Sequence, residues 1–380
     1  MPLLSLVILL SLTGCWDKKE LNEVAVVIGA GVDKKDNNYR VTAQVIKPVA
    51  SQGGTSGGSE LPTWSLSADG KTIMDAIRAL NKISPRRLYW PHMQVIIFGE
   101  EMAREGTASV LNWFERDRDS RSGTYVIVTK GKAEDLLNQK IELGNVAAAA
   151  MADFLDTAEL RQIDARRTTL RDFMEFLTTE GIDPALDVID PKDIRGKPET
   201  YQLSGLAVMK GDKLVGYIEG QKAMGIDIAY QKFQYGIITV PFNENGDFFS
   251  YQVTDLRNNV KTDVTDGTMK ISMDIFIEGN LSDNTGSEEM VLQPEKMRQA
   301  EKQIQKEVIQ SIQQTFKEAA ELESDLYGIG REIRRHHPDF WHQVKEEWPS
   351  RLKEVQLNIK VEANIRRSGL IFDPTPSKLK

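Results

Sequence analysis

The first part of the chain alternates short apolar runs with segments of helical period. In residues 72–83, Ile73, Ile77 and Leu80 fall on one face of a helix, and Ser84-Pro85 predicts its end. Strands are predicted where apolar and polar residues alternate or where a short apolar run is bounded by turn residues. The predicted strands are 24–33, 39–48, 63–67, 93–98 and 125–129, and the predicted helices are 72–83, 103–114 and 133–139. This alternation predicts a mixed α/β domain over residues 15–140.

The middle of the chain predicts helices followed by a β-hairpin. Residues 146–160 and 170–177 have helical patterns, and 181–198, with three prolines, predicts an extended connector. Two strands then flank the turn Lys210-Gly211-Asp212-Lys213, which is typical of a hairpin. We expect these elements to form a middle domain at residues 141–230.

The last third changes pattern. Strands are predicted at 233–241, 247–254 and 268–278, with turn residues between them. A helix predicted at 294–326 carries an apolar stripe, and the alternation from Val355 to Ile365 predicts a returning strand. We expect a C-terminal domain at 231–380, in which an antiparallel sheet packs on one long helix. The expected fold class is therefore α+β (mixed α/β), with about three unlike domains.

Composition is that of a globular protein and excludes several classes. Of the 380 residues, 40% are apolar and 27% are charged. No run of about 18 apolar residues occurs, so a polytopic membrane protein is excluded. With 48 Lys and Arg against 56 Asp and Glu, the formal net charge is −8. Because nucleic-acid-binding proteins usually present a basic face, we expect no nucleic-acid partner.

Residues 1–14 have the pattern of a lipoprotein signal peptide. Leu3 to Leu12 is apolar apart from two serines, and Leu12-Thr13-Gly14-Cys15 has the form of a bacterial lipobox. In such a signal the cysteine thiol receives a diacylglyceryl group, and two acyl chains hold a protein durably at a membrane. We therefore expect Cys15 to be a lipid anchor on the outer face of the cell membrane.

The N-terminus departs from a standard signal peptide at one point, and its cysteine has an alternative interpretation. No Lys or Arg precedes Cys15, so the basic region that usually opens a signal peptide is expected further upstream. The alternative interpretation is a buried structural cysteine. With one cysteine in the sequence, no internal disulfide can form.

Residues that carry catalysis or bind metals are sparse. The histidines are His92, His336, His337 and His342, and their spacing does not indicate a metal site. The sequence contains no P-loop and no dinucleotide-binding fingerprint, so we expect no cofactor. No G-x-S-x-G nucleophile motif accompanies His92, which favours a structural role for this residue over catalysis. The sequence predicts no enzyme.

Several charged residues are candidates for contact with partner molecules. The run 116–121 alternates in charge, which indicates either a solvated turn with local ion pairs or a contact loop. We retain His92, Arg116, Asp117 and Arg121 as candidate partner contacts. The basic residues between Arg331 and His337 indicate either a solvated helix end or a segment that approaches anionic lipid.

Five blocks of sequence resemble one family. The first is Gly14-Cys15-Trp16-Asp17-Lys18-Lys19-Glu20-Leu21, followed by a glycine-containing strand that ends at Asp33. The others are Leu88–Gly106, Arg116–Thr129, Leu206–Gly216 and Asp325-Leu326-Tyr327-Gly328-Ile329-Gly330, which precedes Trp341 and Trp348. In this order, the blocks resemble those of the Ger(x)C-type spore germination proteins, the lipoprotein C subunits of GerA-type germinant receptors.

The resemblance implies a non-catalytic subunit of a nutrient germinant receptor. It implies two membrane-spanning partners, an A-type subunit and a transporter-like B-type subunit, in the spore inner membrane. It also implies a response to small nutrients such as amino acids, sugars or nucleosides. The alternative is a lipid-anchored solute-binding protein of a transporter, which needs a cleft between two similar lobes. An anchored envelope enzyme is a third and less favoured interpretation.

Overall fold

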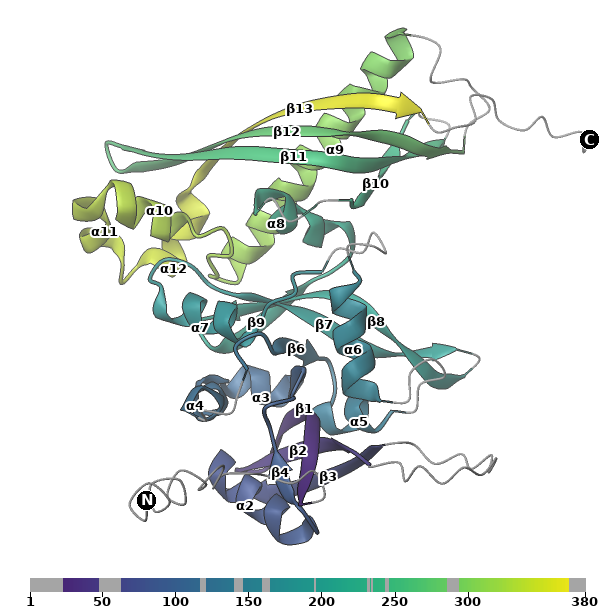
Figure 1. The fold of residues 1–380 in the computed structure, drawn as a ribbon. Helices are drawn as coiled ribbons and strands as arrows, with labels where there is room; N and C mark the ends of the chain where they lie inside the picture. Colours follow the sequence, from purple (N-terminus) through teal and green to yellow (C-terminus); the bar gives the residue numbers. More distant parts are fainter. Residues whose placement is uncertain are drawn as a thin grey trace, which may run out of the picture.

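Two β-sheets carry the fold, and the chain completes the first before it begins the second (Figure 1). The computed structural model describes residues 23–47, 63–116, 121–139, 146–158, 165–194, 196–230, 233, 235–242, 246–285 and 294–368. Helices cover both faces of the first sheet, and a long helix lies against the second. The protein is α+β, as the sequence predicts.

Nine strands of the described chain form the first sheet. They are β1 (Val24–Lys35), β2 (Asn38–Ile46), β3 (Thr63–Gly70), β4 (Arg87–Tyr89), β5 (Val95–Gly99), β6 (Tyr125–Thr129), β7 (Ala185–Ile194), β8 (Lys197–Lys210) and β9 (Lys213–Ile218). Their order is β3-β2-β1-β5-β6-β7-β8-β9, with β4 also paired to β1. The central strands β1, β5, β6 and β7 are parallel, and antiparallel hairpins extend the sheet on both sides.

The two faces of this sheet are covered by different helices. One face packs against α2 (Ile73–Ile83), α3 (Glu100–Glu105), α4 (Ala108–Arg116) and α7 (Leu170–Thr178). The other packs against α5 (Ala133–Asn138) and α6 (Ala147–Asp156). Close approach on the second face depends on β1, because a Cβ at Gly29 would overlap the Cβ of Ala148 in α6. Buried Gln44 links both helices to β2: its Nε2 donates to the Leu137 carbonyl, and its Oε1 accepts from the Ala148 N–H.

The second sheet has the order β10-β11-β12-β13. Its strands are β10 (Ile237–Pro241), β11 (Phe248–Thr265), β12 (Thr268–Asn284) and β13 (Gln356–Ser368), and α9 (Pro294–Glu321) packs on it. The predicted apolar stripe of the long helix is confirmed. Its buried side chains include Ala300, Ile304, Val308, Ile312 and Phe316.

The direction of the last strand differs from our expectation. We expected an antiparallel sheet, but β13 runs parallel to β12, so the sheet is mixed. The connection from β12 passes through α9 before the chain returns, and such a crossover can bring a strand back in the same direction. Four short helices complete this part of the chain: α8 (Met224–Ala229), α10 (Ile329–His336), α11 (Pro338–Val344) and α12 (Trp348–Arg351). The 3₁₀ turns η1 (Gly220–Ala223) and η2 (Leu352–Glu354) flank them.

Two local expectations also differ from the structure. The segment 181–198, expected as an extended connector, contains β7 and the start of β8. Pro191 is tolerated because β6 pairs with β7 at Asp187 and Val188 and not as far along as Pro191. The pair of β6 and β7 also joins strands from the two sides of the expected domain boundary at residue 140, so both belong to one sheet. The helix expected at 103–114 is divided into α3 and α4 at Gly106, whose φ is 134°.

Candidate functional site

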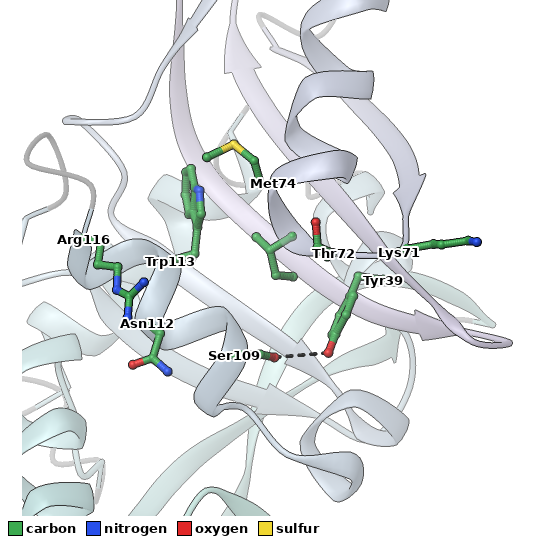
Figure 2. A pocket seen from close by; sticks show the side chains of 9 residues that line it. Tyr39, Lys71, Thr72, Met74, Ser109, Asn112, Trp113 and Arg116 are labelled. Carbon is green, nitrogen blue, oxygen red and sulfur yellow. Dashed lines mark hydrogen bonds between the residues drawn. The ribbon is translucent and has the colours of Figure 1, made fainter.

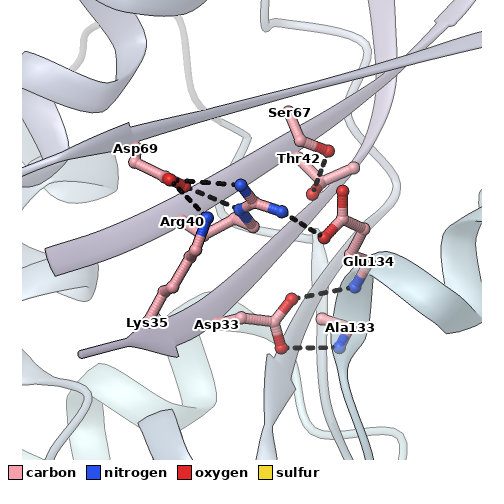
Figure 3. A network of polar contacts seen from close by, with 8 residues as sticks. All are labelled: Asp33, Lys35, Arg40, Thr42, Ser67, Asp69, Ala133 and Glu134. Atoms are coloured by element: carbon pink, nitrogen blue, oxygen red, sulfur yellow. Dashed lines mark hydrogen bonds and ion pairs between the residues drawn. The ribbon is translucent and has the colours of Figure 1, made fainter.

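The carboxyl end of β1 is closed by Asp33. Its Oδ1 accepts a hydrogen bond from the Ala133 N–H at 2.7 Å and its Oδ2 accepts one from the Glu134 N–H at 2.9 Å, at the start of α5 (Figure 3). Burial raises the pKa of Asp33, and the two N–H donors oppose the rise. Open α/β sheets often bind phosphates at the carboxyl ends of their parallel strands. Here the side chain of the protein itself occupies that position.

Gly99 makes room for this carboxylate. A Cβ at residue 99 would overlap Oδ1 of Asp33. The glycine ends β5, the strand beside β1, and the Glu100 N–H that follows donates to the Gly131 carbonyl. The Asp that ends the family-like strand at 24–33 therefore binds the start of α5 and packs closely against Gly99 of β5.

An ionic network continues from α5 across the surface of the sheet (Figure 3). The Arg40 guanidinium donates to both carboxylate oxygens of Asp69, at 2.6 and 3.1 Å, and to Glu134 at 3.0 Å. Lys35 Nζ donates to Asp69 at 3.0 Å. The hydrogen bonds from Arg40 hold the pKa of Asp69 down at about 2. The network joins β2, β3 and α5, so we assign it a structural role.

Asp325 organises the contact between the two sheets. Its carboxylate accepts hydrogen bonds from the N–H groups of Ile329 (3.0 Å) and Gly330 (2.7 Å) and from Trp348 Nε1 (3.0 Å). Burial raises the pKa of Asp325 to about 6, although these three donors oppose the rise. Gly328, at φ 64°, is the N-cap of α10 and directly precedes Ile329 and Gly330, whose N–H groups bind the carboxylate. The fifth family-like block thus forms a helix start held by a buried acid.

Asp183 holds Asp325 from the side of the first sheet. Its Oδ1 accepts the Gly211 N–H at 2.7 Å and its Oδ2 accepts the Asp325 N–H at 2.8 Å. The Asp183 N–H donates in turn to the Asp325 carbonyl at 2.9 Å.

Nearby, the Arg331 N–H donates to the Gly181 carbonyl at 2.8 Å, and an added Cβ at Gly330 would lie 2.8 Å from the Gly181 Cα. We call these contacts the sheet junction. Sequence analysis missed Asp183 because its partner lies 142 residues away.

A second buried polar cluster lies close to the same region. Arg166 forms an ion pair with Asp227 at 3.1 Å, with side chains 2% and 3% exposed, and its guanidinium lies 4.6 Å from the centre of the Tyr230 ring. Asp187 accepts the N–H groups of Arg166 and Arg167, both at 2.7 Å, and burial raises its pKa to about 6. Because the ion pair is not accessible to solvent, we assign this cluster a structural role in the core.

His92 lies on the surface, in the turn between β4 and β5. Its ring centre is 5.8 Å from that of Tyr89. The neighbouring Trp90 is buried and packs edge-on against Trp113 of α4, with 5.6 Å between ring centres. The aromatic residue of this family-like block therefore fixes the turn, and the turn presents His92 to solvent.

Two surface grooves receive the other candidate contact residues. A groove of about 670 Å³ lies between the start of α2 and α4, and Met74, Trp113 and Arg116 line it (Figure 2). Tyr39 and Ser109 also line it, and their hydroxyls lie 3.3 Å apart (Figure 2). We call it the α2–α4 groove.

The second groove, of about 620 Å³, lies at the amino ends of β5 and β6. Arg121 lines it together with Met93, the residue after His92, and Asp156. The Tyr125 hydroxyl donates to Asp156 at 2.5 Å, and burial is the main cause of the rise in the pKa of Tyr125 to about 12. The structure thus associates Arg121 with the His92 turn and assigns Arg116 to the α2–α4 groove.

Asp117 and the lipobox residues Leu12, Thr13, Gly14 and Cys15 lie outside the described residues. Within the ranges that are described, no group of three or more His, Cys, Asp or Glu side chains could hold a metal ion. Among the helices described, none is long and apolar enough to cross a membrane.

The fold is that of an α+β protein with two unlike sheets joined by buried carboxylates. The candidate contact residues lie in grooves and turns on its surface. Residues 17–191 match the spore germination protein N-terminal domain, and residues 204–369 match the spore germination B3/GerAC-like C-terminal domain. The chain belongs to this family of spore germination proteins, which confirms the resemblance stated from its sequence blocks.

Individual relatives match along almost their whole length. Spore germination protein KC of Bacillus subtilis (strain 168) is 28% identical over 407 residues, covering 100% of this chain and 98% of that protein. Spore germination protein A3 of the same organism is 25% identical over 366 residues, covering 95% of each. The crystal structure of the GerBC protein matches with a TM-score of 0.54 and 17% identity, covering 92% of this chain and 99% of that one. This likeness shows a shared fold.

Proposed function

We propose that the chain is the lipid-anchored, non-catalytic subunit of a nutrient germinant receptor in the spore inner membrane. The observation that carries the proposal is the match of both halves of the chain, in order, to spore germination domains at 17–191 and 204–369. Cys15 carries a diacylglyceryl group on the outer face of the membrane, and the two sheets bind membrane-spanning A-type and transporter-like B-type subunits.

The use of buried polar groups supports an assembly role. Asp33, Asp183 and Asp325 lie in family-like blocks or contact them, and each accepts two or more N–H groups from the protein itself. In a binding or catalytic site, such groups would face a ligand. The exposed His92, Arg116 and Arg121 are the residues that we propose as partner contacts, together with Asp117. A shared membrane raises the local concentration of all subunits, so modest contact areas are sufficient.

The anchor is tested by replacing Cys15 with Ala in the native organism. The variant should leave the membrane pellet, whereas a matched variant in the same segment, Asn22→Ala, should remain there. Release of both variants, or retention of both, would contradict a lipid anchor at Cys15.

The receptor assignment is tested by purifying a tagged copy from the inner membrane of dormant spores. Two polytopic proteins in comparable amounts should accompany it, and deletion of the gene should abolish germination with at least one nutrient. Recovery of the chain alone, in a detergent that preserves other complexes, would favour the alternative of a solute-binding lipoprotein.

The alternative makes its own distinct prediction. A solute-binding protein usually encloses its ligand between two similar lobes, whereas the two sheets here differ in strand number and order. A ligand that binds the folded state raises the melting temperature. A thermal-shift screen with amino acids, sugars and nucleosides should therefore leave the isolated chain unchanged under our proposal, and strong stabilisation would favour the alternative.

A further inference from the structure

Four segments of the first sheet end together on one side of the molecule. Register pairs Val24 at the start of β1 with Arg87 at the start of β4. In the neighbouring pair of strands, Val45, near the end of β2, lies opposite Trp64, near the start of β3. Helix α2 begins after β3, runs back along the sheet and ends at Ile83, four residues before Arg87. Figure 1 shows these strands and α2 on the side of the first sheet that lies away from the second sheet.

This end carries exposed apolar side chains. Ile46 and Trp64 are each 40% exposed and Ile83 is 54% exposed. They come from three different elements, β2, β3 and the end of α2, so their exposure is not the result of one irregular segment. Trp64 pairs with Val45, which packs on the α2 face, so Trp64 lies on that face and Ile46, the next residue, on the other. Isolated apolar residues on a surface are common, but exposed Trp and Ile side chains on both faces of one sheet end favour a partner that meets the end itself.

The charged residues at this end are almost all basic. Lys47, Lys82 and Arg87 are exposed and Arg86 is half-buried. In the described segments that form this end, 23–26, 44–47, 63–66 and 80–88, Glu23 is the one acidic residue. The whole chain has a net charge of −8, so the concentration of positive charge here is local. We call the following set the basal surface: Ile46, Lys47, Trp64, Lys82, Ile83, Arg86 and Arg87.

We propose that the basal surface contacts an anionic lipid bilayer directly. Tryptophan and aliphatic side chains surrounded by Lys and Arg are the combination that enters the headgroup region of a membrane. Basic residues gain further affinity from the negative potential of anionic lipid, which falls off within a Debye length.

The position of the lipidation site supports a bilayer as the occupant of this surface. Glu23, where the described chain begins, contributes its carbonyl to a hydrogen bond with the Arg87 N–H, at 3.2 Å. Cys15 is eight residues earlier, so it lies within about 28 Å of Glu23 even if the chain is fully extended. The inference deepens the proposed function and rests on it for the membrane location. It adds an orientation, with β1–β3 and α2 on the lipid and the second sheet furthest from it.

Binding to vesicles tests the surface without the lipid anchor. The probe is the mature chain from residue 15 with Cys15→Ser, mixed with vesicles of equal parts phosphatidylglycerol and phosphatidylcholine, or with phosphatidylcholine alone. We expect binding to the anionic vesicles to exceed binding to the neutral ones and to weaken as salt is raised. Lys82→Gln with Arg87→Gln should reduce the affinity about 25-fold, because each basic residue near such a surface contributes about a factor of five. Ile83→Ser should also weaken binding.

A matched control removes the same charge elsewhere. Arg334 and Arg335, both exposed on α10, carry the basic segment that the sequence also associates with lipid. Arg334→Gln with Arg335→Gln should bind vesicles like the parent chain. Equal loss in both double variants would show a non-specific charge effect and would overturn the proposal. Salt-insensitive binding of the parent, or no preference for anionic vesicles, would overturn it as well, and would indicate that a protein partner covers the surface.

The outcomes separate this inference from the proposed function. Vesicle binding by the unlipidated chain does not depend on Cys15 or on other receptor subunits. If Cys15→Ala releases the protein from spore membranes but the vesicles fail to bind it, only the basal-surface inference is wrong. If the vesicles bind it and no polytopic protein co-purifies, only the receptor assignment is wrong.

Discussion

The carboxylate of Asp325 accepts a hydrogen bond from Trp348 Nε1 across 3.0 Å, and both side chains are buried. Trp348 also packs at 5.5 Å, ring centre to ring centre, against Trp341. The acid therefore begins α10 and fixes α12 with one side chain, while its own N–H is bound by Asp183 from the first sheet. The stability of the whole chain should be sensitive to this one residue.

Asp325→Asn should lower the free energy of unfolding by about 3 kcal/mol. The amide has nearly the same size, but its NH₂ group faces an N–H donor and leaves a buried donor without an acceptor. Urea unfolding followed by tryptophan fluorescence measures the change. Asp339→Asn, at an exposed position on α11, is the matched control and should change stability by less than about 0.5 kcal/mol. A loss of similar size in both variants would contradict the assigned role.

Gly29→Ala should destabilise the first sheet by about 2 kcal/mol, because the new methyl group overlaps the Cβ of Ala148. Ala148→Gly removes the obstacle, so the double variant should recover part of the loss, and a double-mutant cycle should give a clear coupling energy. Gly123→Ala is the control, since no atom lies within 4 Å of a Cβ at that position. Additive effects of the two changes at residues 29 and 148 would contradict the contact.

Stability should depend on the ionisation of Asp69 in acid. Its pKa is about 2 in the folded protein, below the ordinary value of 3.8, so the folded state favours the carboxylate. The resulting stabilisation is complete above about pH 4 and is lost as the pH falls towards 2. Because Asp69 and Arg40 are 32% and 27% exposed, we expect about 1 kcal/mol.

The measurement compares the unfolding free energies of the parent chain and Asp69→Asn at several pH values. The parent should be more stable at pH 5, and the difference should shrink by about 1 kcal/mol on going to pH 2. Asp283→Asn, at an exposed site in β12, controls for general loss of negative charge. A difference between parent and Asp69→Asn that stays constant with pH would show that the ion pair contributes little.

Arg121→Glu should reduce the amount of polytopic protein that co-purifies with the tagged chain. The side chain lines the groove beside the His92 turn, and a reversed charge opposes an acidic partner surface. The melting temperature should stay within about 2 °C of the parent value, because the residue is exposed. Arg116→Glu tests the α2–α4 groove in the same assay, and Arg351→Glu, on α12, is the distant control. Unchanged co-purification for both Arg121→Glu and Arg116→Glu would contradict the assigned contacts.

Local patterns predicted much of the fold. The apolar stripe of α9 recurs from Ala300 to Ala320, about six helical turns, and the turn at 210–213 lies between two clear strands. Both elements are therefore where the sequence indicates them. The direction of β13 could not be predicted in the same way. Alternation shows which face of a strand is buried, and it is identical for parallel and antiparallel pairing.

The buried acids were harder to foresee. Asp33 and Asp325 stand in blocks that the resemblance singled out, yet their partners, Ala133 and Trp348, are 100 and 23 residues away. Asp183 precedes a proline in a segment without periodicity, and such a segment predicts a connector. Apart from the bonds of Asp325 to Ile329 and Gly330, four and five residues on, these contacts form only when distant parts of the chain come together. For Arg121 the alternating charges of 116–121 predict a solvated turn or a contact loop, and the residue is exposed in the structure.

The sheet junction also bears on how the two sheets can move relative to each other. Asp183 and Asp325 join both halves through one set of buried hydrogen bonds, and Gly181 and Gly330 bring the two backbones into direct contact. Bending at this point would break those bonds. We therefore expect the two sheets to move as one body.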